Sequence, residues 1–137
     1  MSRLLPELIC SDLPSSLAFY RLLGFAIAYE RPSERFVYLT RGDAHLMLEQ
    51  PLNRNRLHPR AELARPYGRG VNLTLDVEDV EGVRAVITEA GHPLYLPLEE
   101  RWYERAEDAV GVRQFAVQDP DGYLLRVSQN LGTTRLR

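Results

Sequence analysis

The sequence predicts an α+β fold made of two copies of a βαβββ module. Three observations support this prediction. Each half of the chain begins with a short apolar run before a helical segment, strand-like runs follow each helix, and 67 positions separate the two copies. Asp12 and Gly24, which bound the first helical segment, correspond in this way to Asp79 and Gly91. An internal repeat of this kind predicts that one structural unit occurs twice.

The first module is expected to span residues 4–50. An apolar run at 4–10 reads as a strand, and Asp12 after it can cap a helix with its side chain. Pro14 suits the first helical turn because no hydrogen bond is needed there from its nitrogen, and Gly24 suits the end of the helix. The further strands expected in this module are 25–30, 35–40 and 44–50, with a tight turn at Arg41-Gly42-Asp43.

The second module is expected to span residues 70–130 and to repeat this order. A strand at 71–77 precedes a helix that begins after Asp79 and ends at Gly91. Proline and glycine in Asp119-Pro120-Asp121-Gly122 occupy the positions that a type I turn favours. The further strands expected here are 93–97, 112–118 and 123–129.

Residues 51–69 differ from both modules because they contain three prolines and five arginines. This composition is typical of a solvated linker, and we expect a helical turn at 60–64 within it. An arginine-rich lid over an anionic ligand is the alternative interpretation.

A sheet with one helix packed on it has one covered face and one open face. Two such modules can turn their open faces toward each other, and we expect a curled mixed or antiparallel sheet around a cleft, within a single domain of residues 1–137. Alternate residues of each strand would line that cleft. On the last strand of the first module, His45, Met47 and Glu49 share one side.

Composition excludes several classes of protein. The formal net charge is −2 and 45% of residues are hydrophobic, which indicates a globular chain without the basic footprint of a nucleic-acid-binding protein. Cys10 is the single cysteine, so no disulfide can form within the chain. No stretch has the length of a signal peptide core or a membrane span. We therefore expect a cytoplasmic protein without membrane or nucleic-acid partners.

Two motifs resemble those of the vicinal-oxygen-chelate superfamily, which includes glyoxalase I, extradiol dioxygenases and bleomycin-resistance proteins. Residues 12–25, DLPSSLAFYRLLGF, are similar to its D-L-x-x-S-x-x-F-Y-x-x-L-G-F opening. Residues 115–122, FAVQDPDG, are similar to its F-x-x-x-D-P-D-G signature. The resemblance implies the glyoxalase/bleomycin-resistance fold. Within the superfamily, the segments RGD at 41–43, LMLE at 46–49 and LLRVSQN at 124–130 resemble bleomycin-resistance proteins most.

That closer resemblance implies a homodimer that sequesters a flat or cationic small molecule in a crevice and performs no chemistry. Aromatic side chains could stack on such a ligand, and a carboxylate could attract its charge. Residues 99–104 hold the only tryptophan, and we expect them to form an exposed loop, in which Trp102 either stacks on the ligand or packs on the protein. The candidate ligand-binding residues are Phe36, Tyr38, Met47, Glu49, Asn72, Trp102, Tyr103 and Arg126.

Metal-dependent members of the superfamily take ligands from four strand positions, which align here with Leu5, Glu49, Asn72 and Arg126. Leucine has no donor atom and arginine is a fixed cation, so we expect no metal cofactor and no catalytic residues. Glu49 and Arg126 could instead form an ion pair across the cleft. The alternative function is a lyase, isomerase or dioxygenase of the same superfamily, which would need a divalent metal.

Overall fold

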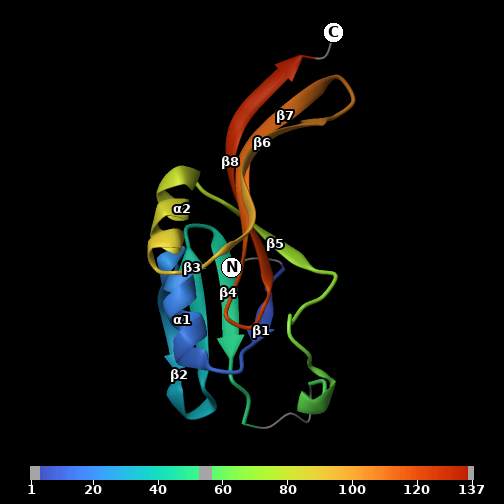
Figure 1. Ribbon diagram of the computed structural model, residues 1–137. Helices are drawn as coiled ribbons and strands as arrows, with labels where there is room; N and C mark the ends of the chain where they lie inside the picture. Colours follow the sequence, from blue (N-terminus) through green and yellow to red (C-terminus); the bar gives the residue numbers. More distant parts are fainter. Residues whose placement is uncertain (1–3, 53–56, 136–137) are drawn as a thin grey trace. The chain divides into compact units, whose positions relative to one another are not determined.

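The computed structural model describes residues 4–52 and 57–135, and the chain divides into two compact units. The first unit comprises residues 1–69 and 119–123, and the second comprises 70–118 and 124–137. Each unit contains one βαβββ module whose four strands form a mixed sheet, which confirms the α+β fold class (Figure 1).

The first sheet has the strand order β1-β4-β3-β2, and β1 is parallel to β4 while the other pairs are antiparallel. Its helix packs against β4. A short 3-10 helix, η1, joins β2 to β3. The bounds are Glu7–Ile9 for β1, Leu13–Leu22 for α1, Ala26–Arg31 for β2, Pro32–Glu34 for η1, Phe36–Arg41 for β3 and Ala44–Glu49 for β4.

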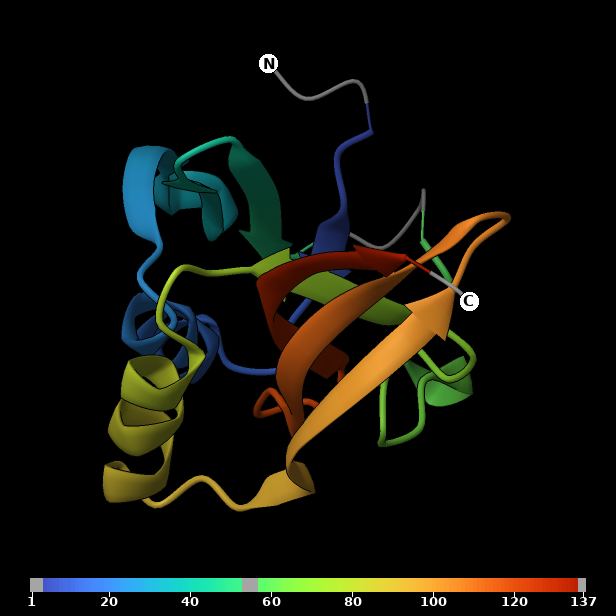
Figure 2. The same cartoon turned by 90° about the horizontal axis from the view of Figure 1, so that it is seen from above.

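The second sheet repeats this topology with the order β5-β8-β7-β6, and β5 is parallel to β8. Figure 2 shows β6, β7 and β8, in orange to red, as a strongly twisted ribbon of neighbouring strands. The bounds are Asn72–Asp76 for β5, Val80–Glu89 for α2, Leu94–Glu104 for β6, Asp108–Gln118 for β7 and Leu124–Arg135 for β8.

The ends of both helices follow the repeat that the sequence predicts. The Asp12 side chain accepts a hydrogen bond from the backbone N–H of Ser15 at 3.2 Å, and Asp79 accepts one from Gly82 at 3.1 Å. Gly24 and Gly91 follow the two helices with φ angles of +95° and +90°, which only glycine adopts at little cost. Matching caps and stops therefore set the same helix length in each module.

The turn at residues 119–123 belongs to the first unit, although both strands that it joins belong to the second. The Gly122 N–H donates to the Asp119 carbonyl at 2.9 Å, as a type I turn requires, and Asp119 Oδ1 accepts from the N–H groups of Asp121 and Tyr123. The Tyr20 hydroxyl donates to Asp119 Oδ2 at 2.7 Å. This contact joins the two motifs of the sequence, one on α1 and one in the turn.

Three further hydrogen bonds fix the same turn in the first unit. Asp121 accepts hydrogen bonds from the backbone N–H and the hydroxyl of Ser11. The Tyr123 hydroxyl donates to the Ile9 carbonyl at 3.0 Å. Burial raises the pKa of Asp119, and the hydrogen bond from Tyr20 opposes that rise. The turn thus has a structural role in the first unit, because its acidic side chains accept hydrogen bonds from Ser11 and from Tyr20 of α1.

The second sheet is longer than the sequence predicts. The expectation of an exposed loop at residues 99–104 is wrong, because these residues belong to β6. β6 continues to Glu104, β7 begins at Asp108, and β8 runs to Arg135 rather than ending at residue 129. Charged side chains occupy both faces of this hairpin, so its sequence lacks the alternation that identifies a half-buried strand.

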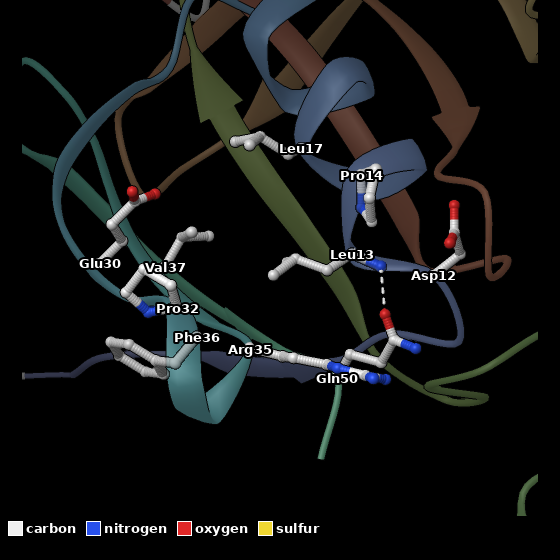
Figure 3. Close-up of a pocket in the computed structure, with 10 residues that line it drawn as sticks. All are labelled: Asp12, Leu13, Pro14, Leu17, Glu30, Pro32, Arg35, Phe36, Val37 and Gln50. Carbon is white, nitrogen blue, oxygen red and sulfur yellow. Dashed lines mark hydrogen bonds between the residues drawn. The ribbon is translucent and has the colours of Figure 1, made fainter. Parts of the chain in front are cut away.

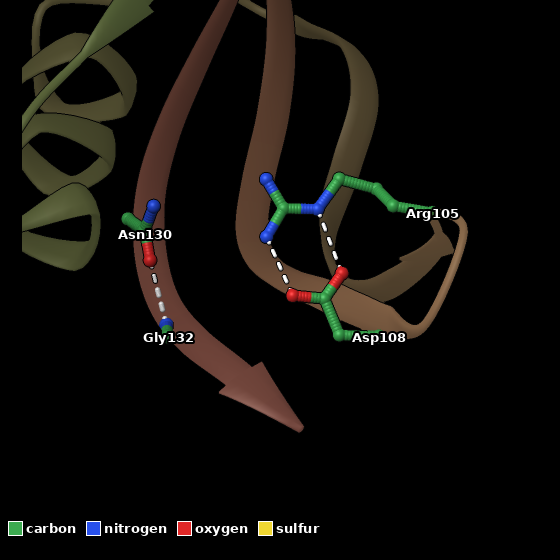
Figure 4. Close-up of polar contacts among 4 residues, drawn as sticks. All are labelled: Arg105, Asp108, Asn130 and Gly132. Atoms are coloured by element: carbon green, nitrogen blue, oxygen red, sulfur yellow. Dashed lines mark hydrogen bonds and ion pairs between the residues drawn. The ribbon is translucent and has the colours of Figure 1, made fainter. Parts of the chain in front are cut away.

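Local contacts hold this extension in place (Figure 4). Arg105 binds both carboxylate oxygens of Asp108, at 2.9 and 2.8 Å, and closes the hairpin. Asn130 Oδ1 accepts from the Gly132 N–H at 2.6 Å, beside a register shift between β7 and β8. The extension is therefore ordered by pairing and polar contacts rather than by an apolar face.

The linker between the modules contains one short 3-10 helix, η2, at Arg60–Glu62, within the helical turn that the sequence predicts. Farther along, the Tyr67 N–H donates to the Asp121 carbonyl at 2.9 Å, so the linker is attached to the turn. Among the residues that the structure describes, no helix is long and apolar enough to cross a membrane.

Candidate functional site

One face of the first sheet brings together four of the predicted ligand-binding residues. Tyr38 pairs with Met47 and Phe36 pairs with Glu49 between β3 and β4, so their side chains share a face. Residues on the opposite face, such as Leu48, are buried toward α1. We call the face that carries Phe36, Tyr38, Met47 and Glu49 the aromatic–acidic face.

A β-bulge adds two residues that the sequence analysis missed. The register between β2 and β3 shifts between Ile27 and Tyr29, so Tyr29 pairs with Tyr38 and Arg31 with Phe36. Simple alternation from the start of β2 would have placed Tyr29 on the opposite face. No glycine or other local signal in the sequence marks the shift.

The aromatic rings of this face are layered. Tyr29 stacks on Tyr38 with ring centres 4.9 Å apart and an angle of 20° between the rings. Arg31 covers the Phe36 ring, with its guanidinium carbon 3.8 Å from the ring centre. Phe36 and Tyr38 are buried, whereas Tyr29 is 49% exposed. Tyr29 is therefore the ring in this layer that a ligand can reach.

The side chain of His45 orients the inner ring, Tyr38. His45 Nδ1 lies 2.6 Å from the Tyr38 hydroxyl, and the two rings meet edge to face. His45 is half-buried on β4, as expected for a strand histidine at this position. The hydrogen bond restrains Tyr38 and gives Tyr29 a fixed surface on which to stack.

A pair of carboxyl groups lies beside the aromatic rings. β1 runs parallel to β4, with Glu7 opposite Met47 and Ile9 opposite Glu49, which places Glu7 and Glu49 on the same face. Burial, a hydrogen bond that protonated Glu49 donates to Glu7, and the negative charges of Glu7 and Glu34 together raise the pKa of Glu49 to about 7. The Arg31 cation opposes this rise. Glu49 is therefore partly protonated near neutral pH.

The second sheet carries the other four predicted residues, and it divides them between its faces. Asn72 and Arg126 share one face through the parallel pairing of β5 and β8. The Tyr103 hydroxyl lies on that face as well and accepts a hydrogen bond from Gln114 at 2.9 Å. Trp102 lies on the opposite face.

The position of Trp102 depends on a glycine in the neighbouring strand. Trp102 pairs with Gly111, and a Cβ atom at Gly111 would lie 2.6 Å from the indole ring. The indole therefore packs flat over the β7 backbone, and its N–H donates to Glu100 at 3.2 Å. This contact favours packing on the protein over ligand stacking for Trp102.

The model of the glyoxalase/bleomycin resistance protein/dioxygenase superfamily matches residues 4–127. The chain belongs to this superfamily. A solved member of the superfamily from Vibrio splendidus 12B01 is 39% identical, with alignment over 91% of this chain and 95% of that chain, at a TM-score of 0.42. No curated protein matches the chain significantly.

Two solved structures of lower sequence identity share the fold. TioX from Micromonospora sp. ML1 has a TM-score of 0.70 at 21% identity, with 96% of this chain and all 100% of that chain covered. A lactoylglutathione lyase from Agrobacterium tumefaciens has a TM-score of 0.60 at 19% identity, with 94% of each chain covered. At these identities the comparison supports the fold and not a shared ligand or reaction.

The superfamily includes metal-dependent enzymes, and the aligned positions of this chain do not fit a metal ion. Leu5 offers no donor atom, Arg126 is a cation, and the raised pKa of Glu49 leaves its carboxyl group partly protonated near neutral pH. Among residues 4–52 and 57–135, no three histidine, cysteine, aspartate or glutamate side chains are grouped as metal ligands would be. Glu49 and Arg126 lie on different units, so their ion pair stays a prediction.

Proposed function

We propose that this superfamily member is a binding protein of the bleomycin-resistance type, which sequesters a planar, cationic small molecule on the aromatic–acidic face. The observation that carries the proposal is the half-exposed Tyr29 ring stacked on Tyr38 beside the carboxyl pair of Glu7 and Glu49. A flat heteroaromatic group can stack on Tyr29, and the carboxyl pair supplies the negative charge that attracts a cation.

The chain's own Arg31 supports this choice of ligand. Its guanidinium, itself a planar cation, lies over the Phe36 ring at 3.8 Å while forming an ion pair with Glu34. The aromatic–acidic face thus already holds one planar cation over a ring. A ligand cation above Tyr29 would place a second planar cation over a neighbouring aromatic ring of the same face.

Two features of the proposal come from the superfamily resemblance rather than from this face. We propose that the protein forms a homodimer, as the resemblance to bleomycin-resistance proteins implies, and that it is cytoplasmic. β2 and β6 lie at the outer positions of their sheets, and subunit association is one way to cover such strands. Light scattering of the purified protein tests the dimer directly, and a monomer would remove any site between subunits.

Calorimetric titration with metal-free and copper-loaded bleomycin, and with an unrelated planar cation such as acriflavine, tests the function. Saturable binding to at least one of these probes is expected. Tyr29→Leu and Glu49→Gln should each weaken it about tenfold or more, because each removes one side of the recognition. Tyr95→Leu, which removes a tyrosine that is 57% exposed on β6, is the matched control and should leave the affinity unchanged.

Two results would reject the proposal. The first is no binding of any planar cation, or binding that the Tyr29 and Glu49 variants leave intact. The second is a stoichiometric divalent metal in the purified protein, detected by elemental analysis, together with turnover of a small substrate. That second result would establish the enzymatic alternative.

A further inference from the structure

The first unit contains a cavity of about 520 Å³ that shares only Phe36 with the aromatic–acidic face. Leu13 and Leu17 of α1, Pro32 of η1 and Val37 of β3 provide most of its apolar lining. Figure 3 shows Leu13, Leu17 and Val37 directed into a common space. Val37 pairs with Leu48 on the helix side of the sheet, so Val37 lines this cavity from the face opposite the aromatic–acidic face, while Phe36 also contributes to the lining. Its volume suits a small organic molecule.

A second, smaller cavity of about 120 Å³ adjoins the first and is polar and cationic. Ser11, Arg60 and Tyr67 contribute to its lining. Arg35 and Gln50 line both cavities and form their common wall. An apolar compartment therefore lies next to a compartment that two arginine residues, Arg35 and Arg60, help to line.

Arg35 is held at this wall in an unusual backbone conformation. Its φ and ψ angles are both +51°, in the left-handed region, and it is the one non-glycine residue in the described part of the chain with a positive φ. Its N–H donates to the Pro32 carbonyl at 3.1 Å, and its carbonyl accepts from the Gln50 N–H at 2.9 Å. Strained positions of this kind are concentrated at functional sites.

The charges near the cavities define where an anion could bind. Within residues 4–52 and 57–135, neither Arg35 nor Arg60 forms an ion pair. Asp12 caps α1 through Ser15, and Figure 3 shows the Glu30 carboxylate on the side of the large cavity away from the Arg35 guanidinium. An anionic group is therefore favoured at the common wall and in the small cavity, and disfavoured at the far rim.

We propose that the two cavities form a binding site for a small carboxylic acid with an apolar body, such as a medium-chain fatty acid or an aryl carboxylate. The carboxylate would bind between Arg35 and Arg60, where charge-assisted hydrogen bonds are available. The apolar body would occupy the cavity lined by Leu13, Leu17 and Val37 and be removed from water there. The site would thus select the opposite charge from the aromatic–acidic face.

Titration with octanoate, followed by isothermal calorimetry and by the methyl NMR signals of Leu13, Leu17 and Val37, tests this proposal. We expect saturable binding of octanoate with shifts of these methyl signals, and much weaker binding of 1-octanol and octylammonium. Arg35→Gly should weaken octanoate binding about tenfold or more. Glycine tolerates a positive φ, so this variant should fold at least as well as the native chain.

Arg21→Gln, which removes an exposed arginine in the last turn of α1 that lines neither cavity, is the matched control and should bind octanoate normally. Three outcomes would overturn the proposal: no saturable binding, unchanged affinity in Arg35→Gly, or 1-octanol binding as tightly as octanoate. Glu49→Gln separates the two sites, because it should weaken binding of a planar cation and leave octanoate binding intact. Failure of one site therefore does not imply failure of the other.

Discussion

Replacing Gly122 with alanine measures how closely the turn between β7 and β8 packs against the linker. Gly122 has a φ of +95°, and a Cβ atom there would lie 2.6 Å from both Cα and Cβ of Pro66. Gly91, which follows α2, has a φ of +90°, and an added Cβ would meet nothing within 4 Å. The two alanine variants therefore share the same backbone penalty and differ in the steric clash.

The expected magnitudes follow from these two contributions. Placing a residue with a side chain in the left-handed region costs about 1–2 kcal/mol, so Gly91→Ala should lower the free energy of unfolding by that amount. The clash at Gly122 involves the Pro66 backbone, which cannot rotate away, and such overpacking costs about 1–3 kcal/mol more. Gly122→Ala should therefore cost about 2–5 kcal/mol.

Urea denaturation followed by far-UV circular dichroism and by Trp102 fluorescence supplies the measurement. Coincident curves would establish that both variants report one transition. Gly42→Ala is a second control within the first unit, since Gly42 has a φ of +56° and no atom within 4 Å of an added Cβ. If all three variants lost the same free energy of unfolding, the packing of the turn on Pro66 would be refuted.

Three other perturbations have defined outcomes. Tyr20→Phe removes the hydroxyl bound to Asp119 and should cost about 1.5–3 kcal/mol at neutral pH, with a smaller loss in acid, where Asp119 becomes protonated. Glu49→Gln should stabilise the protein by about 1 kcal/mol at alkaline pH in urea denaturation. The reason is that the pKa of Glu49 is about 7 in the folded state, whereas the ordinary value for a glutamate is 4.5, so the native protein loses stability as the pH rises through that interval. Gly111→Val should displace Trp102 and shift its fluorescence emission to longer wavelength.

Each of these outcomes has a control or a contradicting result. Tyr95→Phe removes the hydroxyl of an exposed tyrosine and should leave the free energy of unfolding within about 0.5 kcal/mol of the native value. A stability difference between Glu49→Gln and the native protein that stays constant from acid to alkaline pH would contradict the raised pKa of Glu49. Unchanged emission in Gly111→Val would show that the indole does not rest on β7.

Local signals in the sequence predicted most of the fold. Asp12 and Asp79 are recognisable as caps because their side chains bond to the backbone a few residues away, and such contacts need no knowledge of the rest of the chain. The glycine after each helix is a signal of the same kind. Strand parity likewise placed Met47 and Glu49 on one face.

The remaining features depend on contacts between distant segments. Tyr29 reaches the aromatic–acidic face because one residue is inserted in the β2 register, and nothing near Tyr29 marks the insertion. Glu7 becomes part of the site because β1 pairs with its parallel neighbour β4. The paired residues, Glu7 and Met47, are 40 positions apart in the chain. The β6–β7 extension is stabilised by Trp102 over Gly111, a pair visible only when the register is known.

The composition of the first unit has a consequence for biosynthesis. Tyr20 and Asp119 are 99 positions apart, and Ser11 and Asp121 are 110 positions apart, yet both pairs belong to that unit. A ribosome must therefore make nearly the whole chain before α1 and the end of β1 can satisfy their polar groups. During translation, the first module should therefore be an incomplete, aggregation-prone intermediate. When the first module is produced alone, it should fold stably only if a separate peptide supplies residues 119–123.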